Sequence, residues 1–266
     1  MYSVTASLAL LWRRLLEAIA RHAGVAMNVV EHSPPAPITE LWSRRDQGAV
    51  LMCGLPYSQA FPQPELVVAP VPSPRRYGNE PRYRSEFIVR TESSFRRLED
   101  TFGGRIAFMT PHSQSGFAAA IHHLMAAGGG QPLYREVIAP CVTPLGSLAA
   151  VIDGRADVAP VDAFALDLMR RHAASLAAQV RSVDETERTP IPPFVASTPP
   201  APRLVRAFLD AADDVALRPI MDELLLQCFV RPDAADYVPL RQRLETAIAF
   251  WRRHPLAAAI HPAFAL

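Results

Sequence analysis

The hydrophobic positions of this chain alternate between helical and extended periodicity, which is the pattern of an α/β protein. Residues 4–22 carry apolar side chains at steps of three and four, and these fall on one stripe of a helix. Gly24 follows where a helix commonly ends with a left-handed residue. We therefore predict an amphipathic helix over residues 4–22.

Short apolar runs of strand length recur along the chain, and segments of helical periodicity separate them. The predicted strands are 25–30, 48–52, 66–71, 86–90, 106–109, 137–139, 158–161 and 194–197. The further predicted helices are 38–44, 93–100, 117–127, 147–152 and 164–178, and then most of 202–254 with breaks near Pro232 and Pro239. Such alternation predicts mostly parallel sheets flanked by helices.

Two of the predicted strands end in small polar residues, and a helix begins directly after them. The strand 106–109 leads into residues 110–116, and the strand 158–161 leads into Asp162. Such turns place backbone N–H groups at the carboxyl ends of strands, where open α/β sheets bind ligands. Ser and Asp also serve as ordinary helix N-caps. The sequence leaves both interpretations open at each turn.

The first turn has the composition of an anion site. Hydroxyl and amide side chains and a glycine precede the helix, where free N–H groups and the helix dipole favour negative charge. His112 lies beside them and is the one histidine that we expect to contact a ligand. The expected ligand contacts in the turn are Ser113, Gln114, Ser115 and Gly116.

Three further residues are candidates for the walls of a ligand pocket. Asp162 could accept hydrogen bonds from a ligand amine or hydroxyl. Tyr57 follows a predicted strand and turn, and Tyr83 precedes the predicted strand 86–90. A tyrosine combines an apolar ring with a polar hydroxyl, which suits a pocket wall, although a tyrosine of the core would look the same in sequence.

Composition and charge exclude several function classes. The 266 residues suffice for one large domain or two lobes, and a net charge of +1 gives no footprint for nucleic acid. All basic residues are arginine, which excludes a Schiff-base lysine and a Walker-A lysine. No run of 18 apolar residues exists, so we expect no transmembrane helix.

No motif for metal binding or covalent catalysis is present in the sequence. The three cysteines are far apart, which predicts neither a disulfide framework nor a zinc site. His122 and His123 are adjacent, so on a helix they point in different directions and cannot form an i,i+4 metal pair. We predict no catalytic residue, no metal and no cofactor.

The chain resembles the phosphate/phosphite/phosphonate substrate-binding proteins of ABC importers. The similarity lies in the order of several segments, including Leu-Pro-Tyr at 55–57, the Ser-Gln-Ser-Gly turn, and a Ser-Leu-Ala-Ala-Val helix followed by Gly-Arg-Ala-Asp-Val-Ala-Pro-Val-Asp at 154–162. The matched segments are 41–57, 83–90, 98–116 and 147–162, with weaker matches at Phe229 and Tyr237.

The resemblance implies a two-lobed type 2 periplasmic-binding-protein fold. Lobe 1 would comprise residues 1–84 and 195–266, lobe 2 would comprise 85–194, and a hinge would let the lobes close on the ligand. The anion-binding groups would be Ser113, Gln114 and Ser115, with Asp162 as acceptor and Tyr57 and Tyr83 as pocket aromatics. Gln114 departs from the family, which often has Ser or Thr there.

The same resemblance implies partners and a location. A binding protein of this kind is a monomer that binds a small anion, delivers it to an ABC permease, and is periplasmic or membrane-associated. Residues 4–12 are apolar but lack a preceding basic segment, so we expect that a leader and the first strand are missing and that a cytoplasmic location stays open. The alternatives are a cytosolic enzyme of menaquinone or pyrimidine biosynthesis on this fold, and a ligand-sensing domain.

Overall fold

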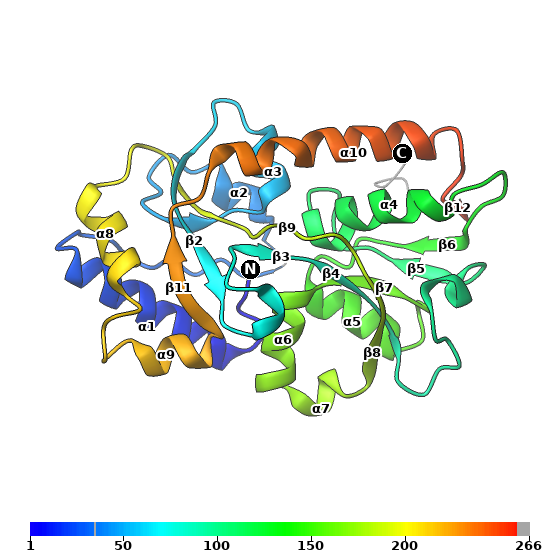
Figure 1. Cartoon of the computed structure of the whole chain (residues 1–266), viewed down its shortest axis with the longest axis horizontal. Helices are drawn as coiled ribbons and strands as arrows, with labels where there is room; N and C mark the ends of the chain where they lie inside the picture. The colour runs from blue at the N-terminus through cyan, green and yellow to red at the C-terminus, as the bar shows by residue number, and fades with distance from the viewer. Residues whose placement is uncertain (35, 260–266) are drawn as a thin grey trace. The chain divides into compact units, whose positions relative to one another are not determined.

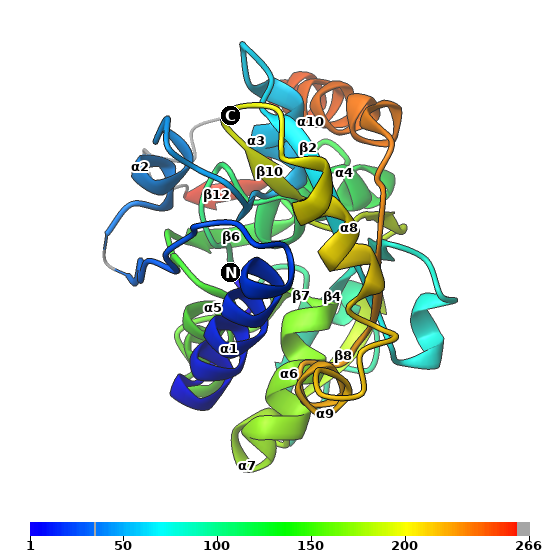
Figure 2. The same cartoon turned by 90° about the vertical axis from the view of Figure 1, so that its left-hand side faces the viewer.

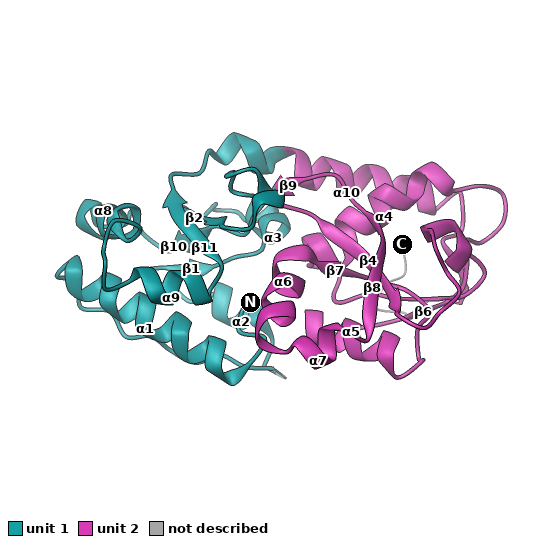
Figure 3. Cartoon of the chain, turned by 60° about the horizontal axis from the view of Figure 1, so that its bottom comes forward, with its two compact units in different colours: residues 1–82, 190–238 teal, residues 83–189, 239–266 magenta. Residues whose placement is uncertain are grey.

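The chain folds into two compact units in a computed structural model that describes residues 1–34 and 36–259. Unit 1 comprises Met1–Arg82 and Pro190–Val238, and unit 2 comprises Tyr83–Thr189 and Pro239–Leu266 (Figure 3). The sequence prediction placed all of 195–266 in lobe 1. In the structure, residues 239–259 group with unit 2. Residues 260–266 of the predicted lobe lie outside the described part.

Unit 1 is built on a four-stranded sheet of order β1-β10-β2-β11, of which Figure 2 labels the neighbouring strands β10 and β2. All three pairings in this sheet are antiparallel, with Leu51 opposite Phe194 and Phe229 opposite Pro70. The parallel pairing predicted from the alternation of elements is therefore wrong for this sheet. Its strands are β1 (Val50–Leu51), β2 (Glu65–Pro72), β10 (Phe194–Ala196) and β11 (Leu226–Val230).

Helix α1 (Ala6–His22) covers this unit's core with the predicted apolar stripe, in which Leu8 and Leu15 are fully buried. Thr5 caps its first turn, and Gly24 adopts the left-handed conformation after its end. It packs against α8 and α9. The other helices of this unit are α2 (Ile38–Trp42), α3 (Gly54–Gln59), η1 (Arg75–Tyr77), α8 (Pro202–Asp210), α9 (Arg218–Glu223) and η5 (Ala234–Tyr237).

Unit 2 contains two three-stranded sheets with different pairing. The sheet β12-β6-β5 is parallel, as predicted, whereas β4 lies between β7 and β8 and is antiparallel to both. A parallel bridge from Ile106 to Val158 connects β5 to the segment before β7. The strands are β4 (Ser85–Arg90), β5 (Arg105–Ala107), β6 (Tyr134–Ile138), β7 (Ala159–Asp162), β8 (Val180–Glu185) and β12 (Ala257–Ala259). The short strands β3 (Arg82–Tyr83) and β9 (Thr189–Pro190) pair where the chain passes between units.

The helices of unit 2 alternate with its strands along the chain, and α10 enters from unit 1, which ends at Val238 (Figure 1). Helix α5 packs against β7 and β4, and the last turn of α10 lies on α4, because the indole N–H of Trp251 donates to the carbonyl of Ile121 at 2.8 Å. The helices are η2 (Leu98–Thr101), η3 (Gln114–Ala118), α4 (Ala119–Leu124), η4 (Met125–Ala127), α5 (Pro144–Ile152), α6 (Ala163–His172), α7 (Ala174–Ala177) and α10 (Val238–Trp251).

Several predicted elements differ from the structure, among them the helix predicted over 93–100, of which only η2 (Leu98–Thr101) is helical. Residues 25–30 form no strand, because no described strand pairs with them. Residues 226–230, predicted as helix, form β11, since Leu225 takes a positive φ of 53° that ends the helical segment before it. Pro239 does not break α10, because it stands in the first turn, where a proline costs no hydrogen bond.

Candidate functional site

The turn after β5 begins a helical stretch that runs from Gln114 to Ala127. Ser113 is its N-cap, and its hydroxyl oxygen accepts a hydrogen bond from the amide of Gly116 at 2.9 Å. The first turn is a π-helix, in which the amide of Ala118 donates to the carbonyl of Ser113. The N-cap interpretation of Ser113 is therefore confirmed by the geometry of the turn.

Ser115 differs from Ser113, since its polar groups are not used by the turn. The side chain is only 6% exposed, and within the described chain neither its amide nor its hydroxyl makes a hydrogen bond. Its carbonyl is satisfied, because it accepts from the buried hydroxyl of Ser85 at 2.8 Å. A buried serine in this state offers two adjacent donors to a ligand.

Gly116 is required by close packing and not by its backbone conformation. A methyl group on its α-carbon would lie 2.5 Å from Sδ of Met109 and 2.6 Å from Cγ of the same residue. The carbonyl of Gly116 accepts from the amide of Met109. The glycine thus lets β5 and the following turn approach each other.

The second turn has a capping carboxylate that is buried. Oδ1 of Asp162 accepts from the amides of Phe164 and Ala165 at 2.9 and 3.0 Å, so Asp162 is the N-cap of α6. The sequence left open whether Asp162 is an N-cap or a ligand contact, and the structure shows that it is an N-cap. A role of Asp162 as a ligand acceptor stays a prediction.

Ser85 in β4 links the two turns, and sequence reasoning did not identify it. Its α-carbon is the register partner of Asp162, and its side chain donates to the carbonyl of Ser115. Its own amide donates to the hydroxyl of Thr186 at 3.0 Å. A serine that opens a buried strand gives no signal in sequence, because its role depends on pairing between strands distant in the chain.

The next residue of β4 anchors this arrangement through a buried ion pair. Glu86 is 1% exposed, and both of its carboxylate oxygens accept from Arg170 of α6, at 3.0 and 2.7 Å. Such a fork-to-fork geometry is the strongest form of a charged hydrogen bond in proteins. It fixes α6, which Asp162 caps, onto β4, which Ser85 begins.

The remaining predicted site residues lie apart from these hydrogen bonds. His112 is exposed and makes no hydrogen bond with the described residues. Tyr83, in unit 2, is buried. Tyr57, in unit 1, is buried against Tyr237 with ring centroids 5.0 Å apart, and burial raises the pKa of its phenol. Gln114 is buried in the first turn.

No group of three or more His, Cys, Asp or Glu side chains could hold a metal ion within residues 1–34 and 36–259. The three cysteines are free. No helix of the described chain is both long and apolar enough to cross a membrane. The chemistry available at the two turns is hydrogen bonding.

A sequence model of a protein family, described as "ABC transporter, phosphonate, periplasmic substrate-binding protein", matches residues 4–237. The chain belongs to this family. The match covers both turns and all the residues predicted to bind a ligand. Its members are substrate-binding proteins of transporters and not enzymes, so the enzyme alternative is set aside.

Solved structures show the same fold. The chain is similar to a binding protein of an ABC phosphonate transporter from Pseudomonas aeruginosa, with a TM-score of 0.76, 15% identity, and coverage of 94% of this chain and 86% of that one. It is also similar to PhnD1 of Prochlorococcus marinus in complex with methylphosphonate, with a TM-score of 0.72, 13% identity, and coverage of 90% and 92%.

A third similar structure is a Xanthomonas citri protein bound to ATP, with a TM-score of 0.62, 17% identity, and coverage of 93% of this chain and 94% of that one. No curated protein matches the chain in sequence. The predicted type 2 periplasmic-binding-protein fold is confirmed, as is the role of a solute-binding component of an ABC importer.

Proposed function

We propose that this protein binds a small oxyanion of the phosphonate or phosphate type at the turn formed by residues 113–116. One observation carries the proposal, namely the buried Ser115 whose amide and hydroxyl have no hydrogen-bond partner in the described chain. Family membership supplies the class of ligand. The start of the helical stretch adds a partial positive charge that favours an anion.

Binding would rest on the two donors of Ser115 that the described chain leaves unused and on the charge of the acceptor. A hydrogen bond to a charged group typically contributes about 1.5–3 kcal/mol. The oxygens of a phosphonate would accept from the Ser115 amide and hydroxyl together. Ser113 would act indirectly, because its hydroxyl oxygen already holds the Gly116 amide and thereby shapes the turn.

Asp162, Gln114, Gly116, His112 and the two tyrosines, Tyr57 and Tyr83, remain predicted contacts. Only Oδ1 of Asp162 accepts the capping hydrogen bonds of α6, so the effect of Asp162 on ligand binding would be separable from its effect on stability. We propose in addition that the protein works as a periplasmic or membrane-associated monomer that delivers its ligand to an ABC permease. Light scattering after gel filtration tests the monomer.

A thermal-shift screen of the wild-type protein tests the proposed ligand class. The screen uses methylphosphonate, inorganic phosphate, phosphite and sulfate, with small amides as uncharged controls. A ligand at about 100 times its dissociation constant adds about 2.7 kcal/mol to the free energy of unfolding. We expect at least one phosphorus oxyanion to raise the melting temperature, and no response to any of them would contradict the proposal.

A further inference from the structure

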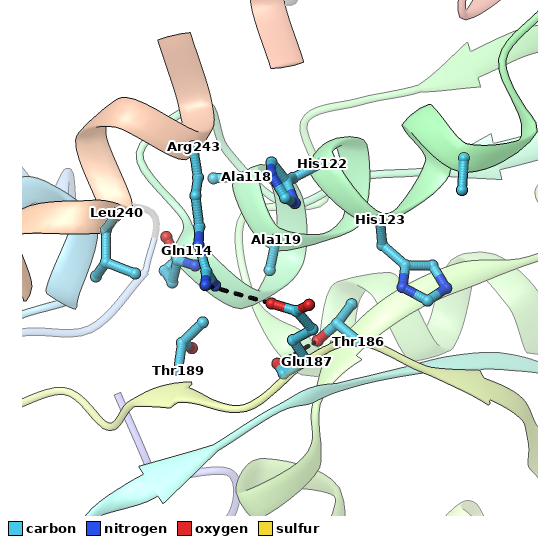
Figure 4. A pocket seen from close by; sticks show the side chains of 11 residues that line it. Gln114, Ala118, Ala119, His122, His123, Thr186, Glu187, Thr189, Leu240 and Arg243 are labelled. Atoms are coloured by element: carbon cyan, nitrogen blue, oxygen red, sulfur yellow. Dashed lines mark hydrogen bonds and ion pairs between the residues drawn. The ribbon is translucent and has the colours of Figure 1, made fainter. Parts of the chain in front are cut away.

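A pocket lies in unit 2 along the helical stretch that begins at Gln114. Its volume is about 290 Å³, at the lower end of the range for ligand pockets. Among the predicted site residues only Gln114 lines it in the described chain, so it is distinct from the Ser115 donors. Figure 4 shows Arg243 of α10 extending toward Glu187, with Gln114 beside it and His122 on α4.

The hollow exists because one face of this helical stretch carries alanines. Ala118, Ala119 and Ala126 line the pocket from that side, and Leu240 closes it from α10. Longer side chains at the alanine positions would fill the space, since protein interiors are close-packed. The pocket therefore has a small apolar floor under several polar groups.

Charges of both signs meet in this pocket at the surface of unit 2. Nη2 of Arg243 lies 3.3 Å from Oε2 of Glu187, with 38% and 73% of the two side chains exposed. An exposed pair of this kind contributes little to stability, so a ligand that contacts both groups displaces it at low cost. A fork of guanidinium N–H groups matches a carboxylate, and Glu187 matches an ammonium group.

Two neutral polar groups in the pocket make no hydrogen bond with the described residues. Thr189 is 4% exposed, yet its hydroxyl makes no hydrogen bond with residues 1–34 and 36–259. The imidazole of His122 likewise has no hydrogen-bond partner in this part of the chain. Burial and the nearby Arg243 lower the pKa of His122, so its ring is neutral at neutral pH and offers one donor and one acceptor.

The acidic group that lines the pocket disfavours a doubly charged anion. Glu187 lines the pocket directly. Nε2 of His123, another lining residue, is 2.7 Å from Oδ2 of Asp184, so that carboxylate is already paired. The Glu187 carboxylate beside the Arg243 guanidinium would repel a phosphonate dianion. A zwitterion instead presents a carboxylate that can pair with Arg243 and an ammonium group that can pair with Glu187.

We infer that this pocket is a second binding site, for a small amino-acid zwitterion whose carboxylate pairs with Arg243 and whose ammonium group pairs with Glu187. The inference goes beyond the proposed binding of an oxyanion and uses different groups. Thr189 and His122 add neutral hydrogen bonds to the same molecule.

The test is a thermal-shift screen of the full chain against the twenty standard L-amino acids, followed by calorimetric titration of each one that responds. We expect at least one small amino acid to raise the melting temperature. Arg243→Gln and Glu187→Gln should each weaken its binding at least about tenfold, the effect of losing one charged hydrogen bond. Arg241→Gln is the matched control, because Arg241 lies on the same helix and pairs with Glu245 outside the pocket.

The variant Ser113→Ala/Ser115→Ala separates this inference from the proposed function. It should abolish the response to methylphosphonate and leave binding of the amino acid unchanged. The inference is overturned if no amino acid raises the melting temperature, if binding survives Arg243→Gln, or if the serine variant abolishes it. Both target side chains are partly exposed, so the Arg243 and Glu187 variants are expected to fold.

Discussion

The two strand-turn-helix segments of unit 2 look alike in sequence and differ in what their polar side chains do. At the second turn, one carboxylate oxygen of Asp162 accepts from two amides of α6. At the first turn, Ser113 performs the capping, which leaves Ser115 buried with its donors unused in the described chain. A cap consumes the groups that a ligand would need, so the turn with an additional buried donor is the better binding site.

The two turns also share one support. Ser85 is paired with Asp162 and donates to the carbonyl of Ser115, and Glu86 beside it binds Arg170. The strand β4 therefore positions the second turn, which stabilises α6, relative to the first turn, which within the described chain has donors free for a ligand. Substitutions in the shared support or in one turn alone test whether the two turns differ in this way.

The largest effect is expected from Arg170→Ala. The change leaves the carboxylate of Glu86 buried without its main partner, and breaking a buried pair costs about 3–5 kcal/mol. Urea denaturation measures the loss. Arg206→Ala is the control, since Arg206 forms an exposed i,i+4 pair with Asp210 that contributes about 0.3–0.5 kcal/mol. Equal losses in the two variants would show that Glu86 does not depend on Arg170.

A smaller loss is expected from Gly116→Ala, which affects the first turn alone. The added methyl overlaps the side chain of Met109, and such overpacking costs about 1–3 kcal/mol. Gly129→Ala provides a matched control, because a methyl there has no atom within 4 Å. Thermal unfolding of both variants decides the point, and a Gly116→Ala protein as stable as Gly129→Ala would argue against the close approach.

Asp162→Ala should cost about 1 kcal/mol, the usual contribution of an N-cap. Asp162→Asn should retain most of the stability, since an amide oxygen can accept the same two hydrogen bonds. Chemical denaturation of the pair tests the assignment. Should the alanine and asparagine variants be equally stable, the second turn would not depend on its cap.

The smallest effect concerns pH and the helix of the first turn. Because the folded state lowers the pKa of His122, the unfolded chain binds the proton more readily, and this histidine destabilises the protein as pH falls below about 6.5. Between about pH 7.5 and 5.5, His122→Asn should lose less stability than the wild type. The exposed His112 gives the control His112→Asn, and identical pH profiles for the two variants would contradict the expected burial effect.

Local patterns in the sequence predicted much of the fold, because they depend on residues close in the chain. The stripe of α1, the left-handed Gly24 and the two turns all follow from spacing within a few residues. Pairing between distant segments does not leave such a signal. Residues 25–30 are apolar enough for a strand but have no described partner, and β11 was mistaken for helix because its partner β2 lies far away in sequence.

The candidate site shows the same limit. Sequence correctly indicated Ser113 and Asp162 as residues at helix starts, and it left cap and ligand contact open for both. The different state of Ser115 could not be read from the pattern Ser-Gln-Ser-Gly, because it depends on a π-helical first turn and on Ser85 from another strand. The pocket around Arg243 brings together residues from three separate segments, which no local motif records.

The most direct test of the central claim is the free energy of unfolding of Ser115→Ala, measured with and without methylphosphonate. If Ser115 is kept for binding, removing its unpartnered hydroxyl should leave the unliganded protein about as stable as the wild type, while the gain from methylphosphonate disappears. Ser175→Ala, at an exposed position of α7, should preserve that gain. A Ser115→Ala protein that is less stable by about 1 kcal/mol and retains the full gain would contradict the account.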